Sequence, residues 1–171
     1  MGVQGCGKST AGMAIADRLG LPFIDGDDLH SASNKAKMAA GNPLTDADRE
    51  PWLDAVGRTL AEGIQQGEAR VIACSALKRR YRDQIRSFAP TARFVHLQGP
   101  QELIAARLSQ RNHEYMPPAL LDSQFQTLEP LEADEAGIRL DVASSPEDIA
   151  EAVADALGDA GNQSPIKPKN G

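Results

Sequence analysis

The segment MGVQGCGKST, residues 1–10, decides the fold of this chain. From Gly2 to Ser9 it matches the pattern G-x-x-x-x-G-K-S, which is typical of a phosphate-binding loop between a buried strand and a helix. Glycines allow the backbone N–H groups of such a loop to surround phosphate oxygens, and the following helix adds the positive end of its dipole. The segment therefore predicts a nucleotide site formed by Gly2, Val3, Gln4, Gly5, Cys6, Gly7, Lys8, Ser9 and Thr10.

Two side chains of this loop carry chemistry of their own. Lys8 is predicted to reach the terminal phosphates of a nucleoside triphosphate, and the Ser9 hydroxyl is predicted to ligate Mg²⁺. We therefore expect ATP and Mg²⁺ as cofactors. A chance match in a glycine-rich turn is the alternative, but a helical pattern follows the loop at once, over residues 8–19.

Only Met1 precedes the loop, although such a loop normally follows a central buried strand. Four or five buried apolar residues, at roughly 1.5–3 kcal/mol each, would contribute about as much as the stability of a whole domain, roughly 5–15 kcal/mol. We therefore expect the natural chain to begin earlier, with Met1 as an internal methionine at the end of that strand. An upstream in-frame segment coding for an apolar strand would support this hypothesis, and an immediate stop codon would refute it.

Apolar runs alternate with helical patterns along the rest of the chain. The runs LPFIDGD, ARVIAC, RFVHL and IRLDV predict buried strands. Strands separated by helices indicate an α/β fold of three layers, in which helices cover both faces of a parallel sheet. Turn and capping residues place the helices at 8–19, 28–40, 45–66 with a Thr45–Asp48 capping box, 79–88, 100–110, from 118 onward, and 145–157.

The composition limits the class of protein. A length of 171 residues favours one domain, which we place at 1–158, and the stretch 159–171 is expected to be disordered. No run of about 18 apolar residues predicts a membrane span, and no secretory leader is evident. The net charge of −6 argues against a general nucleic-acid binder. Two cysteines, Cys6 and Cys74, form no disulfide framework, which favours a cytoplasmic protein.

An acidic segment, DGDDLH at 25–30, follows the first of the predicted strands. It places Asp25 and Asp27 at the carboxyl end of a strand, where ligands bind in open α/β sheets. We assign Asp25 to a Mg²⁺-bound water and Asp27 to an acceptor hydroxyl, which it would orient or deprotonate. An Asp-Gly turn is the alternative. The next strand ends in Cys74-Ser75 and not in an acidic residue, which favours the metal role of Asp25.

Five basic residues gather at the predicted helix 79–88. Lys78, Arg82 and Arg86 recur at every fourth position and so share one helical face. Cations in the first turn oppose the helix dipole, and this arrangement becomes favourable where an anion binds. Because the helix follows the carboxyl end of a strand, we interpret Lys78 and Arg82 as ligands of an anionic substrate. A solvated basic face is the alternative.

Several of these segments together resemble the bacterial gluconokinases. The resemblance is carried by GVQGCGKS, DGDDLH, NKAKMAAGNPLTDADREPWL, CSALKRRYRD and LLDSQFQTLEPLEADE, and it extends from residue 2 to about 157. The phosphate-loop motif is common, whereas KMAAGNPLTDADREPWL and CSALKRRYRD are much more specific. The resemblance implies a nucleoside-kinase-like P-loop fold and phosphorylation of the 6-hydroxyl of D-gluconate by MgATP, giving 6-phospho-D-gluconate. It also implies a cytoplasmic location and often a homodimer.

Three further residues enter the expected site. Arg49 would bind the carboxylate of the substrate in bidentate fashion, although Asp46 or Asp48 would suit it equally well as a partner. His30, in DGDDLH, would hydrogen-bond a sugar hydroxyl. Arg111 would act in catalysis, as described next.

Arg111 precedes a polar loop, and the region 111–117 corresponds to the mobile lid of similar kinases, whose arginine stabilises the transferring charge. Arg107, one turn earlier, is a second candidate. The usual lid pattern resembles R-x-x-H-F-M-P, whereas this chain has RNHEYMP, with Glu114 in place of the expected histidine. The role of the arginine therefore transfers more directly than any role of a lid histidine.

Two alternatives stay open. Shikimate kinases and adenylylsulfate kinases also carry an acidic signature after the second strand, and a basic helix would suit any anionic acceptor; the segment GNPLTDADREPWL favours the gluconokinases. The other alternative is a nucleotide-binding protein without catalysis, because a phosphate loop without its strand would bind ATP weakly. The presence of Lys8, Ser9, Asp25 and Asp27 argues against it.

Overall fold

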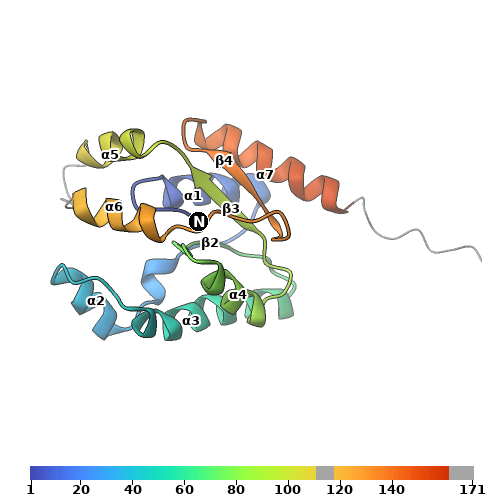
Figure 1. The fold of residues 1–171 in the computed structure, drawn as a ribbon. Helices are drawn as coiled ribbons and strands as arrows, with labels where there is room; N and C mark the ends of the chain where they lie inside the picture. Colours follow the sequence, from blue (N-terminus) through green and yellow to red (C-terminus); the bar gives the residue numbers. More distant parts are fainter. Residues whose placement is uncertain (111–117, 162–171) are drawn as a thin grey trace, which may run out of the picture.

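The computed structural model describes residues 1–110 and 118–161, of which 118, 119 and 159–161 are described by their backbone alone. Helices and short parallel strands alternate along this part of the chain (Figure 1). The elements are α1 (Lys8–Leu19), β1 (Phe23–Asp25), the 3₁₀ helix η1 (Gly26–Leu29), α2 (Ala32–Ala39), α3 (Asp46–Gln65), β2 (Val71–Ala73), α4 (Arg79–Phe88), β3 (Phe94–Gln98), α5 (Gln101–Ser109), α6 (Pro118–Thr127), β4 (Gly137–Asp141) and α7 (Pro146–Gly161).

The strands form two parallel pairs, β1 with β2 and β3 with β4. The backbone of the first two residues lies between the pairs. The N–H of Leu97 in β3 donates to the carbonyl of Met1 at 3.0 Å, and the N–H of Gly2 donates to the carbonyl of Ser75, just beyond β2, at 3.3 Å. The N-terminus therefore lies at the centre of the molecule, between β2 and β3 (Figure 1). The parallel pairing is as predicted, and the strand expected upstream of Gly2 stays a prediction.

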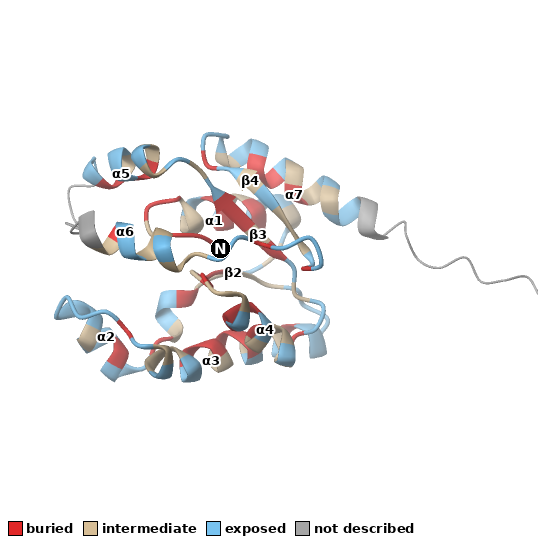
Figure 2. Ribbon diagram, in the orientation of Figure 1, coloured by how far each residue is buried: buried red, intermediate tan, exposed pale blue. Residues whose placement is uncertain are grey.

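Helices cover the strands on both sides. In Figure 1, α2, α3 and α4 lie on one side, and α1, α5, α6 and α7 lie on the other. Two apolar clusters fill the interfaces between helices and strands. Figure 2 shows buried segments along β3 and within α1, α3 and α7. This arrangement confirms the predicted three-layer α/β fold. The first cluster includes Val3, Ile15, Leu97, Ile104, Leu108, Leu121, Val142 and Val153, and the second includes Trp52, Leu53, Val56, Tyr81, Ile85, Phe94 and Leu131.

The capping box predicted for α3 is present. The N–H of Asp48 donates to the Thr45 hydroxyl at 3.2 Å, and the N–H of Thr45 donates to the Asp48 carboxylate at 2.7 Å. These two bonds satisfy backbone donors that have no partner inside the helix, so they fix where α3 begins. Trp52, about two turns into the helix, lies in the second apolar cluster.

Two predicted boundaries are wrong. The helix predicted for 28–40 begins only at Ala32, because Asp28 belongs to η1 and the hydroxyl of Ser31 caps α2 by accepting from the N–H of Asn34 at 3.2 Å. At the other end, α7 includes residues 159–161, so the predicted disordered tail begins too early. Residues 162–171 and the predicted lid, 111–117, lie outside the described residues. Within the described residues, no helix combines the length and apolar character that crossing a membrane requires.

Candidate active site

The phosphate loop has the backbone shape that its glycines predict. Gly5 and Gly7 adopt φ values of +81° and +91°, in the left-handed region that side chains disfavour. A Cβ atom on Gly5 would lie 2.4 Å from Cγ of Leu108, so this glycine is also required for close packing against α5. Gly7 is the N-cap of α1, and its carbonyl accepts from the N–H of Ala11 at 2.9 Å. The loop therefore leads directly into the N-terminus of a helix, which favours anion binding.

Four predicted site residues converge where α1 begins and β1 ends. The hydroxyl of Ser9 donates to the carboxylate of Asp25 at 3.0 Å, and the other oxygen of that carboxylate accepts from the N–H of Asp27 at 3.1 Å. The Lys8 ammonium donates to the carbonyl of Val3 at 3.0 Å, which keeps it over the loop. The structure thus brings the ammonium of Lys8, the oxygen pair of Ser9 and Asp25, and the exposed residue Asp27 to one edge of the strands.

The chemistry of this oxygen pair fits Mg²⁺. Magnesium prefers hard oxygen ligands and usually takes only one or two from the protein, with the remainder from phosphates and water. Ser9 and Asp25 provide a hydroxyl and a carboxylate within hydrogen-bonding distance of each other. Elsewhere in the described chain, too, no group of three or more His, Cys, Asp or Glu residues is arranged to hold a metal. An ion bound at this pair would therefore share its coordination with the nucleotide.

A cavity of about 220 Å³ opens beside the phosphate loop. One wall is the loop with the start of α1, another is Arg107 of α5, and the third is the connection between β4 and α7. The sequence analysis named Arg107 only as a second candidate for the lid arginine. It did not predict the wall between β4 and α7. The helix start at Ser145-Pro146 could have indicated it, because this helix follows the carboxyl end of a strand, where ligands bind in such folds. Arg111 lies outside the described residues. The full lining is Gly5, Cys6, Gly7, Thr10, Ala11, Arg107, Val142, Ser144, Pro146 and Ile149.

On the other side of Asp27, His30 is held by an aromatic stack. Its ring lies on that of Trp52 with centroids 4.4 Å apart and an interplanar angle of 12°, and the indole N–H of Trp52 donates to the carbonyl of Gly26 at 2.7 Å. Nδ1 of His30 is buried without a hydrogen-bond partner. Burial lowers the pKa of His30, although the nearby Asp27 carboxylate opposes the shift. A neutral imidazole with one unused nitrogen is suited to a hydroxyl ligand.

Arg49 lies on the same side of the molecule, at the start of α3. Its guanidinium donates to the carbonyl of Leu44 and is close enough to His30 to lower the pKa of that imidazole further. The two carboxylates that were the alternative partners are bound to other groups: Asp46 pairs with Lys78 and Arg80, and Asp48 pairs with Lys37. This placement favours the substrate role of Arg49 over an ion pair within its own helix.

Arg82 corrects the sequence interpretation. Its side chain is fully buried, and its guanidinium donates to both carboxylate oxygens of Glu135, at 2.7 and 2.6 Å. Further bonds go to the carbonyls of Ala76, Leu77, Glu129 and Pro130. Hydrogen bonds from Arg82 hold the pKa of Glu135 down, at about 2. Arg82 is therefore a structural residue in the interior and cannot contact a substrate from this position.

The other basic residues of α4 are also paired within the chain. Lys78 and Arg80 bind Asp46, and Arg86 binds Glu135. Arg79 binds Glu132 and Asp134, and its N–H donates to the Glu129 carboxylate. The anion expected at the start of this helix is thus the carboxylate of Glu129, a residue of the chain itself. The spacing of the basic residues alone could not predict this partner. Of the predicted pair, only Lys78, with a side chain 25% exposed, is open to a substrate.

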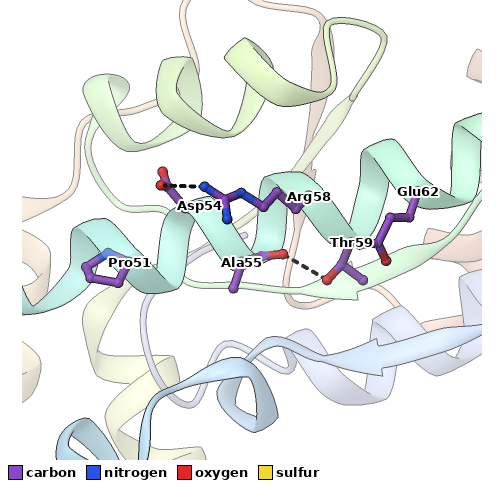
Figure 3. A pocket seen from close by; sticks show the side chains of 6 residues that line it. All are labelled: Pro51, Asp54, Ala55, Arg58, Thr59 and Glu62. Carbon is purple, nitrogen blue, oxygen red and sulfur yellow. Dashed lines mark hydrogen bonds and ion pairs between the residues drawn. The ribbon is translucent and has the colours of Figure 1, made fainter.

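A larger hollow, of about 480 Å³, lies along the outer side of α3 (Figure 3). All of its lining residues belong to that helix. Arg58 pairs with Asp54 at 3.5 Å, and the hydroxyl of Thr59 donates to the carbonyl of Ala55 at 2.8 Å. Asp54 also accepts from the side-chain amide of Gln84 at 2.7 Å, which ties the hollow to α4. None of the predicted site residues lines it. We therefore place the active site at the phosphate loop and not in this hollow, whose lining is Pro51, Asp54, Ala55, Arg58, Thr59 and Glu62.

Comparison with known proteins indicates the family of this chain. The family model described as Shikimate kinase matches residues 4–157. The chain is 44% identical to a probable gluconokinase of Rattus norvegicus, over 92% of this chain and 95% of the rat protein. It is 46% identical to the thermosensitive gluconokinase of Escherichia coli (strain K12), over 83% of this chain and 76% of that protein. The crystal structure of a gluconokinase from Sinorhizobium meliloti 1021 matches with a TM-score of 0.85 and 43% identity, covering 95% of this chain and 91% of that one.

These similarities confirm the predicted P-loop kinase fold and the resemblance on which the predicted function depends. The residues that the family model matches, 4–157, include most of the phosphate loop and the acidic segment after β1. The chain is an ATP-dependent kinase that phosphorylates a hydroxyl group. It belongs to the gluconokinase family of P-loop kinases.

Proposed function

We propose that this protein transfers the γ-phosphate of ATP to the 6-hydroxyl of D-gluconate and produces 6-phospho-D-gluconate. The observation that carries the proposal is the convergence of Ser9, Asp25 and Asp27 beside the phosphate loop, in a chain of the gluconokinase family. Phosphoryl transfer depends mainly on positioning and on neutralising charge, and these residues supply both.

The nucleotide binds along the loop from Gly2 to Thr10, whose backbone N–H groups face the phosphates. Lys8 exchanges its hydrogen bond with Val3 for the terminal phosphates. Ser9 and Asp25 would hold Mg²⁺, which would neutralise charge on the β- and γ-phosphates. The cavity beside the loop, lined in part by Arg107, is the candidate site for the nucleoside portion. Arg111 stays the proposed catalytic arginine.

Asp27 acts at the acceptor. Its exposed carboxylate orients the 6-hydroxyl and accepts the hydroxyl proton as the oxygen attacks the γ-phosphorus. The new bond joins the hydroxyl oxygen to that phosphorus, and the bond from the γ-phosphorus to the bridging oxygen of ADP breaks. The backbone of Asp27 is held by Asp25, so the acceptor residue and the metal residue keep a fixed relation to each other.

The sugar acid lies between Asp27 and the N-terminal part of α3. His30 offers its unpartnered Nδ1 to a hydroxyl, and Arg49 binds the carboxylate. We keep the predicted role of Lys78 as a second ligand of the substrate carboxylate. The substrate carboxylate would compete with that of Asp46 for the Lys78 ammonium. Arg82 is not retained. Its burial leaves Arg49 and Lys78 as the cations that confer preference for an acid over a neutral sugar.

The proposed location is cytoplasmic, and the proposed assembly is a homodimer. Cys6 and Cys74 are both unpaired and buried, and burial raises the pKa of Cys74 to about 12. A thiol with so high a pKa is unreactive at neutral pH, which fits a protein that keeps its cysteines reduced. Light scattering with size-exclusion chromatography measures the mass and so tests the dimer.

The test of the function is acceptor-dependent ADP release. The chain is incubated with MgATP and, in separate reactions, D-gluconate, shikimate, adenylylsulfate or no acceptor, and the position of the new phosphate is determined by ³¹P and ¹³C NMR. We expect ADP release only in the reaction that contains D-gluconate, and the new phosphate on O6 of that acceptor. Release with shikimate or adenylylsulfate would assign the chain to another acceptor. ATP binding by a folded chain without release would favour the nucleotide-binding alternative.

A further inference from the structure

A glutamine of α6 contacts the phosphate loop from outside. The side-chain carbonyl of Gln124 accepts a hydrogen bond from the N–H of Gln4 at 2.7 Å, although the two residues are 120 positions apart in the chain. Gln124 is half-buried and lies near the C-terminal end of the helix. The residue lies within the motif LLDSQFQTLEPLEADE, but the sequence analysis assigned it no role, and the mechanism described above does not use it.

The backbone bond that closes the turn of the loop is longer than this contact. The turn from Val3 to Cys6 is closed by a backbone bond of 3.4 Å, near the upper limit of hydrogen-bond length, whereas the bond from Gln4 to Gln124 has an ordinary length. Gln4 lies between Gly2 and Gly5, and glycines leave the backbone of this segment free to adopt other conformations. An acceptor on a helix therefore restricts the orientation of the Gln4 peptide, and with it the loop that must bind phosphate.

The same stretch of chain is also attached to the acceptor side. Just beyond α6, the N–H of Glu129 donates to the carbonyl of Leu77 at 2.8 Å, and the buried Arg82 donates to the carbonyl of Glu129 at 3.0 Å. The N–H of Leu128 donates to the carbonyl of Gln124 at 2.9 Å, so a helical turn joins the two attachment points. One short segment thus connects the phosphate loop to the beginning of α4, next to Lys78.

We propose that Gln124 is a positioning residue that holds the phosphate loop in register with the acceptor side of the active site. Its carbonyl fixes the Gln4 peptide, and Glu129 fixes the same segment to the residues before α4. The donor phosphate and the acceptor hydroxyl must be aligned within a fraction of an ångström, so a loop that is loose at Gln4 is expected to slow the transfer step more than it weakens ATP binding. This inference rests on the proposed kinase activity.

The experiment replaces Gln124→Met, which preserves the length of the side chain and removes the strong acceptor. Gln126→Met, at an exposed position of the same helix, is the matched control. A third variant, Gln124→Glu, keeps an acceptor oxygen and adds a negative charge near the phosphates. For each variant, kcat, KM for ATP, KM for D-gluconate and the unfolding midpoint are measured beside the unaltered chain.

We expect Gln124→Met to lower kcat by roughly tenfold or more, with a smaller change in KM for ATP and an unchanged unfolding midpoint. Gln124→Glu is expected to keep most of kcat and to raise KM for ATP, because charge repulsion opposes binding while the hydrogen bond is retained. Equal kcat values for Gln124→Met and Gln126→Met would overturn the inference, as would a loss confined to the unfolding midpoint. If the unaltered chain shows no gluconate-dependent ADP release, the proposed function fails instead.

Discussion

Lys8 is the residue whose loss separates a working phosphate loop from a glycine-rich turn. Its side chain is half-buried and makes one hydrogen bond, to the carbonyl of Val3, so the fold depends on it little. We expect Lys8→Ala to lower kcat by roughly 100-fold or more, because a charge that stabilises the transferring phosphate is lost. Circular dichroism should show an unchanged fold. Arg18→Ala, exposed at the other end of α1, is the control, and near-normal turnover of Lys8→Ala would reject the phosphate-loop assignment.

Asp27 and Asp28 are adjacent exposed carboxylates, and only the first is assigned to the acceptor hydroxyl. We expect Asp27→Asn to lower kcat by about 10²–10⁴-fold, the usual contribution of a general base, with little effect on the affinity for ATP. Asp28→Asn is expected to leave both constants near their original values. Steady-state kinetics with either substrate varied makes the comparison. A rise in KM for ATP without a loss of kcat would reassign Asp27 to the nucleotide.

At the scale of elements, the sequence predicted those features that depend on residues close together in the chain, such as helix caps and turns. Thr45 and Asp48 lie three residues apart, so their pattern predicted the start of α3, and the glycines of the loop predicted its left-handed turns. Ser31 is also a local signal, a cap for α2, but the acidic run before it was assigned to the helix. The carboxylate of Asp25 accepts from the N–H of Asp27 and so favours a separate 3₁₀ turn, in line with the Asp-Gly turn that was the alternative for this segment.

Long-range pairs were not predictable in the same way. Arg82 and Glu135 are 53 residues apart, and the helical spacing of the basic residues in α4 contains nothing about the loop that folds over them. Two motifs that were assigned by resemblance, CSALKRRYRD and LLDSQFQTLEPLEADE, are in fact partners in space, joined by Arg79, Arg82 and Glu129. Their specificity to the family is therefore explained at least in part by packing and not by contact with substrate.

The pair of Arg82 and Glu135 gives a test of that packing role. We expect Arg82→Met to lower the free energy of unfolding by about 3–5 kcal/mol, because it leaves the Glu135 carboxylate buried with fewer partners. Urea unfolding measures the change. Arg80→Met, on the same helix but 59% exposed, is the control and should change stability by about 1 kcal/mol or less. The packing role would be wrong if Arg82→Met unfolded at the same urea concentration and only raised KM for D-gluconate.

At the scale of the whole molecule, the centre of the fold holds a histidine ring. His96 of β3 is 1% exposed, and neither of its buried ring nitrogens has a hydrogen-bond partner among the described residues. Burial lowers the pKa of His96 to about 4, assisted by the charges of Arg82 and Arg139, while Glu135 opposes the shift. In the unfolded chain the same side chain has a pKa of about 6.5. The folded protein therefore requires a neutral imidazole at its centre.

The direction of the pH effect follows from these two values. As the pH falls below about 6.5, the unfolded chain binds a proton that the folded chain rejects down to about pH 4, so the free energy of unfolding decreases across this interval by up to about 3 kcal/mol. Above about pH 6.5 the contribution of His96 is constant. The lowered pKa of Glu135 acts in a different interval, because that carboxylate destabilises the fold only when the pH falls through about 4.5 toward 2.

His96→Leu isolates this contribution, since leucine has a similar size and does not titrate. We expect urea unfolding of the unaltered chain to lose stability steeply between pH 6.5 and 4.5, and the variant to lose clearly less over the same interval. A residual slope is expected from His30, whose pKa is also lowered by burial. If the two curves run parallel, the central histidine accepts a proton without opposing the fold, and the interior around β3 must be more polar than its contacts indicate.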